Sequence, residues 1–371
     1  FKLDEIKAMN KIFYGTNISF SDIENLPTNN VEDMSFMFAS STSSNIRVDK
    51  INTSHATNMS YMFYNCSNVE MLNISNFETK NVVDMSNMFA NTKKLQMIDF
   101  GKMNFDTSNV KNMSGLFSYS ESLFQIDISG FNTSQVTDMS RMFQFCSIMD
   151  INLRGLITSQ VTNMSRMFQG FSSLRTDLAN IDTSNVIDMS HMFEDSSIRL
   201  DALAFKTENV ENFSYMFKGC NSLMSLDISK FETKKAHDLS HMFDECSSLK
   251  ELNLNNFNTE KVRNLSGMFK SCTSLTSLNF VSFDTDEVTD MSEMFSYCSS
   301  LTSLNITNFN TKKVKNMYNM FNYCKSLTEL NLQNFDTSEI TDMTKMFSSC
   351  KSLENLDLTN FNTRNVLYIT S

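Results

Sequence analysis

Eight cysteines are the first residues that could do chemistry in this sequence of 371 residues. An even number of cysteines in an extracellular chain commonly forms disulfides. All eight occur at one position of an internal repeat, and other copies have Ser, Thr or Phe there, as at Ser41, Thr92 and Phe171. Such a position serves packing, so we expect buried thiols, with disulfides between adjacent coils as the alternative. The cysteines are Cys66, Cys146, Cys220, Cys246, Cys272, Cys298, Cys324 and Cys350.

A pair of histidines is the second candidate. His237 and His241 have the i, i+4 spacing at which a helix can present two zinc ligands. The other two histidines are His55 and His191, and no third ligand is evident near the pair. Because protein zinc sites use three or four protein ligands, we expect a structural role for the pair, and no metal ion or cofactor.

A series of Asn and Asp residues, one in each copy of the repeat, is the third candidate. Amides in such a series can form hydrogen bonds with one another or with water. Neighbouring carboxylates would repel unless they were hydrated or bound to a cation, so weak calcium binding and contact with a partner remain as alternatives. The series is Asn73, Asp99, Asp127, Asn152, Asp177, Asp201, Asp227, Asn253, Asn279, Asn305, Asn331 and Asp357.

These candidates recur because the chain repeats a unit of about 26 residues. The reference copy, residues 275–300, reads LTSLNFVSFDTDEVTDMSEMFSYCSS, and we number repeat positions from Leu275 as position 1. A phenylalanine at repeat position 21 marks thirteen copies, at steps of 24 to 28 residues: Phe38, Phe63, Phe89, Phe117, Phe143, Phe168, Phe193, Phe217, Phe243, Phe269, Phe295, Phe321 and Phe347. Such repetition predicts a solenoid in which each coil packs only against its neighbours.

The elements of one coil follow from the reference copy. The segment beginning at Leu275 alternates as a short strand with Leu278 and Phe280 inward, and strands one coil apart must be parallel. The Asp284-Thr285 pair is typical of a turn. Apolar residues at offsets 0, 3, 4 and 7 from Met291 predict a short helix, which an Asn, Asp or Ser just before it could cap.

The L-x-x-L-x-L segment resembles the strand of leucine-rich repeats, and the whole unit resembles the 26-residue repeat of bacterial surface proteins, related to BspA-like leucine-rich repeats. Residues 310–317, NTKKVKNM, and 346–350, MFSSC, carry this resemblance. It implies a noncatalytic cell-surface or secreted protein that acts in adhesion or protein binding. We therefore expect an α/β fold: a right-handed leucine-rich-repeat-like solenoid with one short parallel strand and one short helix in each coil.

Composition limits the other possibilities. The net charge of −11 with no basic stripe argues against nucleic acid as a partner, and no run of 18 apolar residues predicts a transmembrane segment. Residues 1–30 precede the regular pattern and are expected to form an N-terminal cap, with helical spacing over 4–13 and partial strand alternation over 18–23. Residues 31–371 are expected to form one continuous solenoid. Phe1 at the start and an incomplete repeat at the end are expected of a piece of a longer protein.

Function in a repeat array is expected where copies differ. The outer side of the predicted helix varies most, and Tyr and Arg are typical anchors of protein contacts. The strand face has mostly Ser, Thr, Asn and Gln, as at Ser75 and Gln333. We expect a protein or glycan partner on a host or neighbouring cell, with a structural spacer or self-assembling subunit as the alternative. An enzyme is not expected. The candidate contact residues are Tyr61, Tyr64, Arg141, Phe145, Arg166, Tyr215, Tyr297 and Tyr323.

Overall fold

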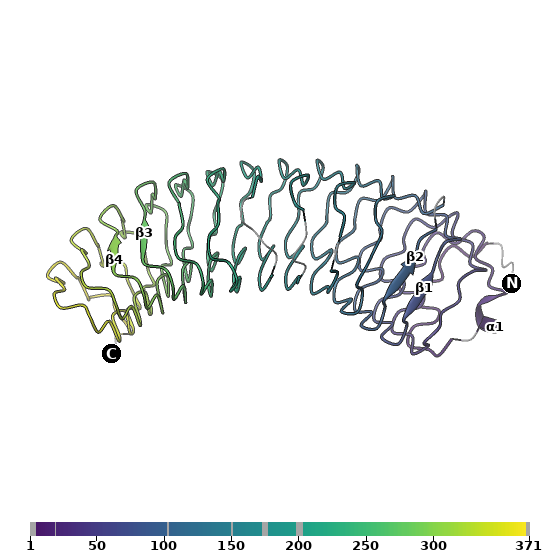
Figure 1. The fold of residues 1–371 in the computed structure, drawn as a ribbon, viewed down its shortest axis with the longest axis horizontal. Helices are drawn as coiled ribbons and strands as arrows, with labels where there is room; N and C mark the ends of the chain where they lie inside the picture. Colours follow the sequence, from purple (N-terminus) through teal and green to yellow (C-terminus); the bar gives the residue numbers. More distant parts are fainter. Residues whose placement is uncertain are drawn as a thin grey trace. The chain divides into compact units, whose positions relative to one another are not determined.

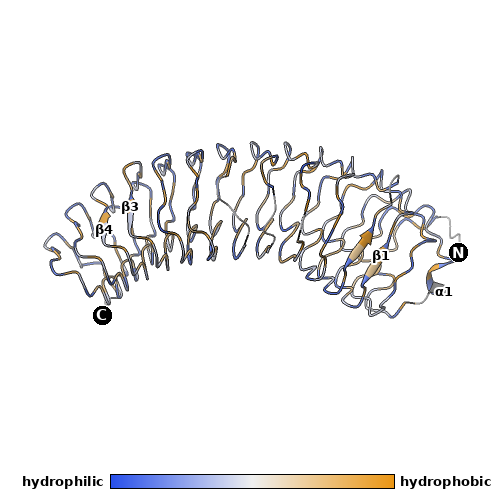
Figure 2. Ribbon diagram, in the orientation of Figure 1, coloured by the Kyte–Doolittle hydropathy of each residue, from blue (hydrophilic) through white to orange (hydrophobic). Residues whose placement is uncertain are grey.

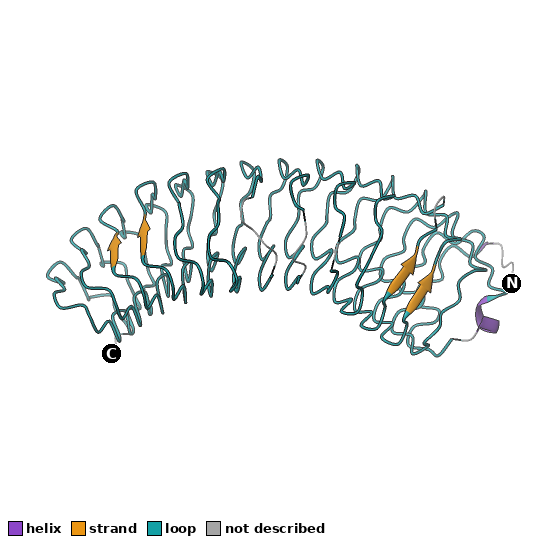
Figure 3. Cartoon of the chain, in the orientation of Figure 1, coloured by secondary structure: helices purple, strands orange, loops and turns teal. Residues whose placement is uncertain are grey.

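The computed structural model describes residues 5–18, 20–101, 104–149, 151–172, 177–197 and 203–368. The chain forms two compact units, Phe1–Thr183 and Ser184–Ser371. Within each unit, successive repeats form successive coils of a solenoid (Figure 1). Each coil is mainly turns and loops (Figure 3), so regular strands and helices account for little of the backbone.

The predicted parallel strand is present in four copies. In the first unit, β1 (Met71–Asn73) pairs with β2 (Met97–Asp99), and in the second, β3 (Ser277–Asn279) pairs with β4 (Ser303–Asn305). In every strand the middle residue is buried and its two neighbours are exposed, which is the predicted alternation. Elsewhere, the described residues at these repeat positions form single bridges at most, as between Glu329 and Asn355.

The N-terminal residues differ from their predicted elements. Residues 20–23, where partial strand alternation was expected, form α1 (Phe20–Ile23), the only α-helix in the described residues. The helical spacing over 4–13 does not correspond to an α-helix in the described part of that segment. Instead, Ala8 forms a parallel bridge with Asp33, and the Phe13 ring stacks on Phe38 with centroids 5.7 Å apart. This segment therefore packs against the first repeat as part of one further coil of the first unit.

The prediction of a short helix in each coil is wrong. In the reference copy the backbone forms three successive turns instead: the amides of Met294, Ser296 and Cys298 donate to the carbonyls of Met291, Glu293 and Phe295, at 3.3, 2.9 and 3.1 Å. Asp290 accepts a hydrogen bond from the Ser292 amide at 2.8 Å, so it caps a turn and not a helix. We call this segment, repeat positions 16–24, the ridge. Consecutive turns bury apolar residues at the same offsets as a helix would, so the spacing alone does not distinguish the two structures.

Backbone hydrogen bonds between coils explain why the ridge is not helical. The amides of Met291 and Phe295 donate to the carbonyls of Asn316 and Met320 in the next coil, at 3.0 and 2.9 Å. The amides of Glu293 and Tyr297 also donate to the next coil, and these two residues have φ values of 56° and 62°. Amides that link neighbouring coils are not available for the internal hydrogen bonds of a helix.

The same left-handed conformation recurs along the ridge at repeat positions 19 and 23. Non-glycine residues there have φ between 51° and 62°, including bulky ones such as Phe36, Arg141 and His191. A left-handed conformation costs a residue with a side chain about 1–2 kcal/mol. The hydrogen bonds between coils must offset that cost in every copy.

Phenylalanine rings fill the core behind the ridge. In the first unit, Phe38 and Phe63 stack with centroids 5.4 Å apart, and in the second, Phe295 and Phe321 stack at 5.7 Å. Such fully buried rings each remove a large apolar surface from water and pack with specific geometry. The marker phenylalanine is therefore the centre of the core in twelve of the thirteen copies, and Phe347 of the last copy is half-buried.

A buried threonine joins each turn to the next coil. Thr285 Oγ1 accepts a hydrogen bond from the Asn310 amide at 2.8 Å and donates to the Asn310 carbonyl at 2.9 Å. Thr259 does the same with Asp284, at 2.8 and 2.6 Å. Thr285 is 1% exposed, so water cannot replace its hydroxyl. This role explains why the sequence has Thr at repeat position 11 in every copy.

We expect Thr285→Val to lower the free energy of unfolding by about 1–3 kcal/mol, because it leaves the amide and the carbonyl of Asn310 without the buried hydroxyl that both contact. Chemical denaturation monitored by circular dichroism measures this. The control is Thr289→Val, which removes a similar hydroxyl that is exposed and bonds only to the Arg263 carbonyl (3.1 Å). Equal effects of the two changes would contradict the proposed role.

Candidate functional site

The cysteines have a structural role. All eight are free thiols, and all but Cys350 are buried, which confirms the prediction of buried thiols. Cys298 Sγ donates to the carbonyl of Phe269 at 3.0 Å, and Ser120 Oγ donates to that of Phe89 at the same distance. The shared donor role explains why Ser replaces Cys in some copies. Burial raises the pKa of the Cys298 thiol to about 12, so it stays protonated and unreactive near neutral pH.

The Asn and Asp series shapes turns within single coils, apart from Asp201, which lies outside the described residues. Asn73 Oδ1 accepts the amide of Ser75 at 3.0 Å, and Asp127 Oδ1 accepts both the hydroxyl (2.6 Å) and the amide (3.0 Å) of Ser129. These two hydrogen bonds, the hydroxyl first, lower the pKa of Asp127. These hydrogen bonds hold the Asn and Asp side chains within their own coil. Hydrogen bonds between series members on neighbouring coils, which we expected from the sequence, are therefore not what holds these side chains in place. In the described residues, no three His, Cys, Asp or Glu side chains are grouped to hold a metal ion.

Two of the three histidines of the second unit, His191 and His241, belong to an aromatic stack on the ridge. Tyr215 lies between His191 and His241, with ring centroids at 4.5 and 4.6 Å. His191 Nδ1 lies 2.6 Å from Glu194, and His241 Nδ1 lies 2.9 Å from Asp244. His241 is thus held by its neighbours in the ridge and not paired with His237. This arrangement has the structural role that the sequence predicts.

The predicted contact residues do lie along the ridge, but as separate stacks. In the first unit, Tyr61 stacks on Phe36 at 4.4 Å, and Tyr64 meets Tyr61 edge-on at 5.4 Å. Phe145 stacks on Tyr119 at 5.0 Å. Tyr61 and Phe145 each cover the equivalent ring of a neighbouring coil, whereas Tyr64 meets a ring of its own coil. Aromatic side chains here therefore stabilise the stack as well as offering surface.

The remaining predicted residues divide between the two units. Arg141 is exposed and Arg166 is half-buried, both at left-handed positions of the first unit. In the second unit, Tyr297 and Tyr323 stack at 4.8 Å, and Lys325 Nζ lies 4.9 Å from the Tyr323 ring centroid. Tyr297 and Tyr323 are 42% and 36% exposed. They form the most exposed of the predicted stacks. Tyr215 lies in the stack with His191 and His241 described above.

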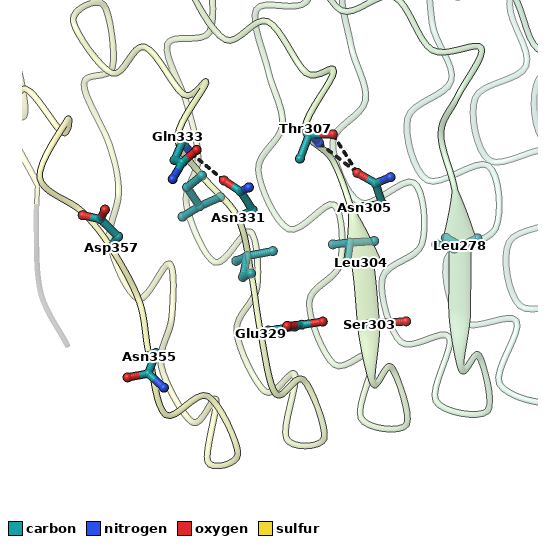
Figure 4. A pocket seen from close by; sticks show the side chains of 12 residues that line it. Leu278, Ser303, Leu304, Asn305, Thr307, Glu329, Asn331, Gln333, Asn355 and Asp357 are labelled. Carbon is teal, nitrogen blue, oxygen red and sulfur yellow. Dashed lines mark hydrogen bonds between the residues drawn. The ribbon is translucent and has the colours of Figure 1, made fainter.

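The strand face of the second unit is hollowed and polar. Its hollow has a volume of about 580 Å³ and extends over coils from Leu278 to Asp357. Side chains such as Asn305 and Thr307, joined by a 2.8 Å hydrogen bond, line it (Figure 4). Of the twelve residues that line the hollow, six are Ser, Thr, Asn or Gln, as predicted for the strand face, two are acidic and four are leucines.

The strand face of the first unit is different, and sequence reasoning missed it. Met71, Met97, Phe124 and Met149 are exposed large apolar residues on four successive copies. In Figure 2 the ribbon of β1 and β2 is coloured toward the hydrophobic end, because Met71 and Met97 adjoin the buried Leu72 and Ile98. The signal was in the sequence: the reference copy has Thr and Ser at repeat positions 2 and 3, whereas Met71 and Met97 stand at position 3 of their copies and Phe124 and Met149 at position 2 of theirs.

The chain matches a known family along nearly its whole length. Four successive segments, residues 7–102, 96–204, 196–303 and 273–371, match the family described as Mycoplasma protein of unknown function, DUF285. No curated protein matches the chain. α1 is a single turn, and no helix in the described ranges has the length and apolar character that crossing a membrane requires.

Solved structures of leucine-rich repeat proteins are similar to this chain. A leucine-rich repeat protein from Eubacterium ventriosum is similar over 82% of each chain, with 16% identity and a TM-score of 0.40. A leucine-rich cell surface protein from Faecalibacterium prausnitzii is similar over 81% of this chain and 76% of its own, with 20% identity and a TM-score of 0.40.

We expect the buried thiols to resist modification in the native protein. With a pKa of about 12 for Cys66, Cys146 and Cys298, only about one thiol in ten thousand is ionised at pH 8. Titration with a chromogenic disulfide reagent should therefore modify Cys350 at most before unfolding, and all eight cysteines after denaturation. Rapid modification of several thiols in the native protein would contradict this.

We expect Gly267→Ala to destabilise the second unit by about 1–3 kcal/mol. Gly267 has a φ of 59°, and a side chain there would collide with the ring of His241. Denaturation midpoints measure the effect. Gly130→Ala is the control, because Gly130 is exposed and a Cβ there would meet nothing within 4 Å. A neutral Gly267→Ala would mean that the His241 ring can move away at no cost.

Proposed function

Because this chain belongs to the DUF285 family, we propose that it is a noncatalytic protein of the cell surface or a secreted protein, and that it binds protein partners on a host or neighbouring cell. Leucine-rich-repeat-type folds are generally used for protein binding. The observation that carries the proposal is the exposed Tyr297–Tyr323 stack on the ridge of the second unit. Tyrosine combines a large apolar area with a polar group, which suits a contact surface.

The ridge supports this proposal by holding its side chains in fixed positions. Tyr297 and Tyr323 both have left-handed φ values, and both amides donate to the next coil, at 2.7 and 2.8 Å. A contact surface that is already ordered loses less entropy when it binds. The core does not dictate these side chains, since the same ridge positions hold Gly219, Ser271 and Glu245 in neighbouring copies.

Charge beside the stack gives it a chemical character. Lys325 Nζ lies over the Tyr323 ring at 4.9 Å from its centroid, an arrangement in which the ring stabilises a cation. A partner surface that offers apolar groups beside a carboxylate fits this arrangement. We propose the other predicted contact residues as secondary contacts. They are Tyr61, Tyr64, Phe145, Tyr215, Arg141 and Arg166.

The test is binding of the purified protein to cells from the native environment. We expect saturable binding, and about tenfold weaker binding for the double variant Tyr297→Ser, Tyr323→Ser, which corresponds to about 1.4 kcal/mol. Val281→Ser is the control, because Val281 is 76% exposed in the same unit but lies outside the ridge.

Two outcomes would contradict the proposal. Absence of saturable binding would remove the binding function. Unchanged binding of the double variant would show that the Tyr297–Tyr323 stack is not the contact surface. Circular dichroism is the folding control, because a variant that binds weakly through misfolding would show an altered spectrum.

A further inference from the structure

The strand face of the first unit presents a row of large apolar side chains, which we call the methionine row: Met71, Met97, Phe124 and Met149. Their exposed fractions are 60%, 47%, 51% and 73%. At repeat position 3, which Met71 and Met97 occupy, the second unit has polar residues such as Ser277 and Ser303. At repeat position 2, which Phe124 and Met149 occupy, it has the exposed Met224 in one copy, followed by Lys250 in the next copy. Contiguous exposed apolar side chains on an otherwise polar surface usually mark an interaction site.

The row consists of two pairs of residues on adjacent coils, Met71 with Met97 at repeat position 3 and Phe124 with Met149 at repeat position 2. Met71 and Met97 are partners in the parallel pairing of β1 with β2. The Met149 amide donates to the Phe124 carbonyl at 3.1 Å, so these two residues are also on adjacent coils. Since neighbouring coils pair about 4.8 Å apart, four of them give a row roughly 14 Å long.

Carboxylates flank one end of the row. A hollow of about 720 Å³ includes Met71 and Met97 together with Arg47, Asp49, Glu70 and Asp99. Arg47 pairs with Asp49 at 3.5 Å, whereas no Lys, Arg or His of the described residues lies within 4 Å of the Glu70 or Asp99 carboxylate. The next coil adds Asp127. The surface around the row is therefore apolar and negatively charged.

We propose that the methionine row binds an amphipathic helix of a partner protein, with the apolar stripe of the helix on the row and basic side chains beside Glu70 and Asp99. Apolar residues on one face of a helix recur about every 5.4 Å, close to the coil spacing of about 4.8 Å. Same-face residues of an extended strand recur about every 6.8 Å, which matches the coils less well. The row would cover about ten residues of helix.

Methionine suits this role because its side chain is unbranched and polarisable. It adapts to apolar partners of different shape, and methionine-rich surfaces are used to bind helices of varied sequence. The carboxylates add attraction for Lys and Arg and disfavour acidic partners. This surface lies in the first unit, so the inference is independent of the Tyr297–Tyr323 contact proposed above.

The experiment is fluorescence anisotropy with a labelled helical peptide of Leu and Lys, in which Leu recurs at i, i+3, i+4 and i+7. Two control peptides accompany it: a scrambled one of the same composition, and one with Glu in place of Lys. We expect saturable binding of the first peptide, at least tenfold tighter than that of either control.

Variants then locate the binding site. The variant with Ser in place of Met71, Met97, Phe124 and Met149 should bind the peptide at least tenfold more weakly. Glu70→Gln with Asp99→Asn should weaken binding several-fold at low salt and reduce its salt dependence. Asn is already present at the equivalent position in Asn73, so Asp99→Asn preserves the turn. Met224→Ser is the control, since Met224 is 67% exposed in the second unit and outside the row.

Several results would overturn the proposal. Equal binding of the scrambled peptide would show that charge alone attracts it, and undiminished binding by the four-serine variant would exclude the row. If the peptide does not bind and the protein self-associates through the row, so that the four-serine variant abolishes self-association, the row binds another copy of the chain. If the peptide does not bind and the protein binds neutral lipid vesicles through the row, so that the four-serine variant abolishes vesicle binding, the row binds a lipid surface. The Tyr297→Ser, Tyr323→Ser variant should bind the peptide normally, which separates this inference from the proposed function.

Discussion

Backbone hydrogen bonds between successive coils are the interaction on which the rest of the structure depends. Along the ridge, alternate amides donate to carbonyls of the next coil, as from Met291 to Asn316 at 3.0 Å. These bonds require left-handed residues at two positions of each copy, and they set the coil spacing at which phenylalanine rings stack in the core. The buried threonine of each turn extends the same connection through a side chain. Secondary structure in the usual sense contributes little.

Sequence reasoning predicted the burial correctly and the backbone incorrectly. The Met, Phe and Cys residues of the ridge are buried as their spacing indicates, but the offsets 0, 3, 4 and 7 fit consecutive turns as well as a helix. A second signal was available. Gly15, Gly115, Gly170, Gly219 and Gly267, five of the eight glycines, lie at left-handed positions of the ridge, and glycine adopts this conformation without steric cost. A regular glycine inside a predicted helix argues against that helix.

The candidate surfaces were predictable to different degrees. The ridge side chains were found because they vary between copies, yet no spacing rule could show that Tyr61 would stack on Phe36 or that Tyr215 would lie between two histidines. Such stacking depends on the left-handed backbone, which directs each side chain toward its neighbour. The methionine row was missed because the consensus described the strand face as polar. Only comparison of the copies one by one distinguishes Met71 and Met149 from the Thr and Ser of the reference copy.

Within each unit, a coil contacts its successor through bonds of the same kind, whichever copy it is. Thr259 meets Asp284 as Thr285 meets Asn310, and the same donor and acceptor groups face forward and backward in turn. Duplication or loss of one whole repeat in the gene would therefore join two surfaces that already fit, with no new partner needed for any backbone group. The number of coils can change over evolution in single steps, while the side chains of individual copies diverge independently.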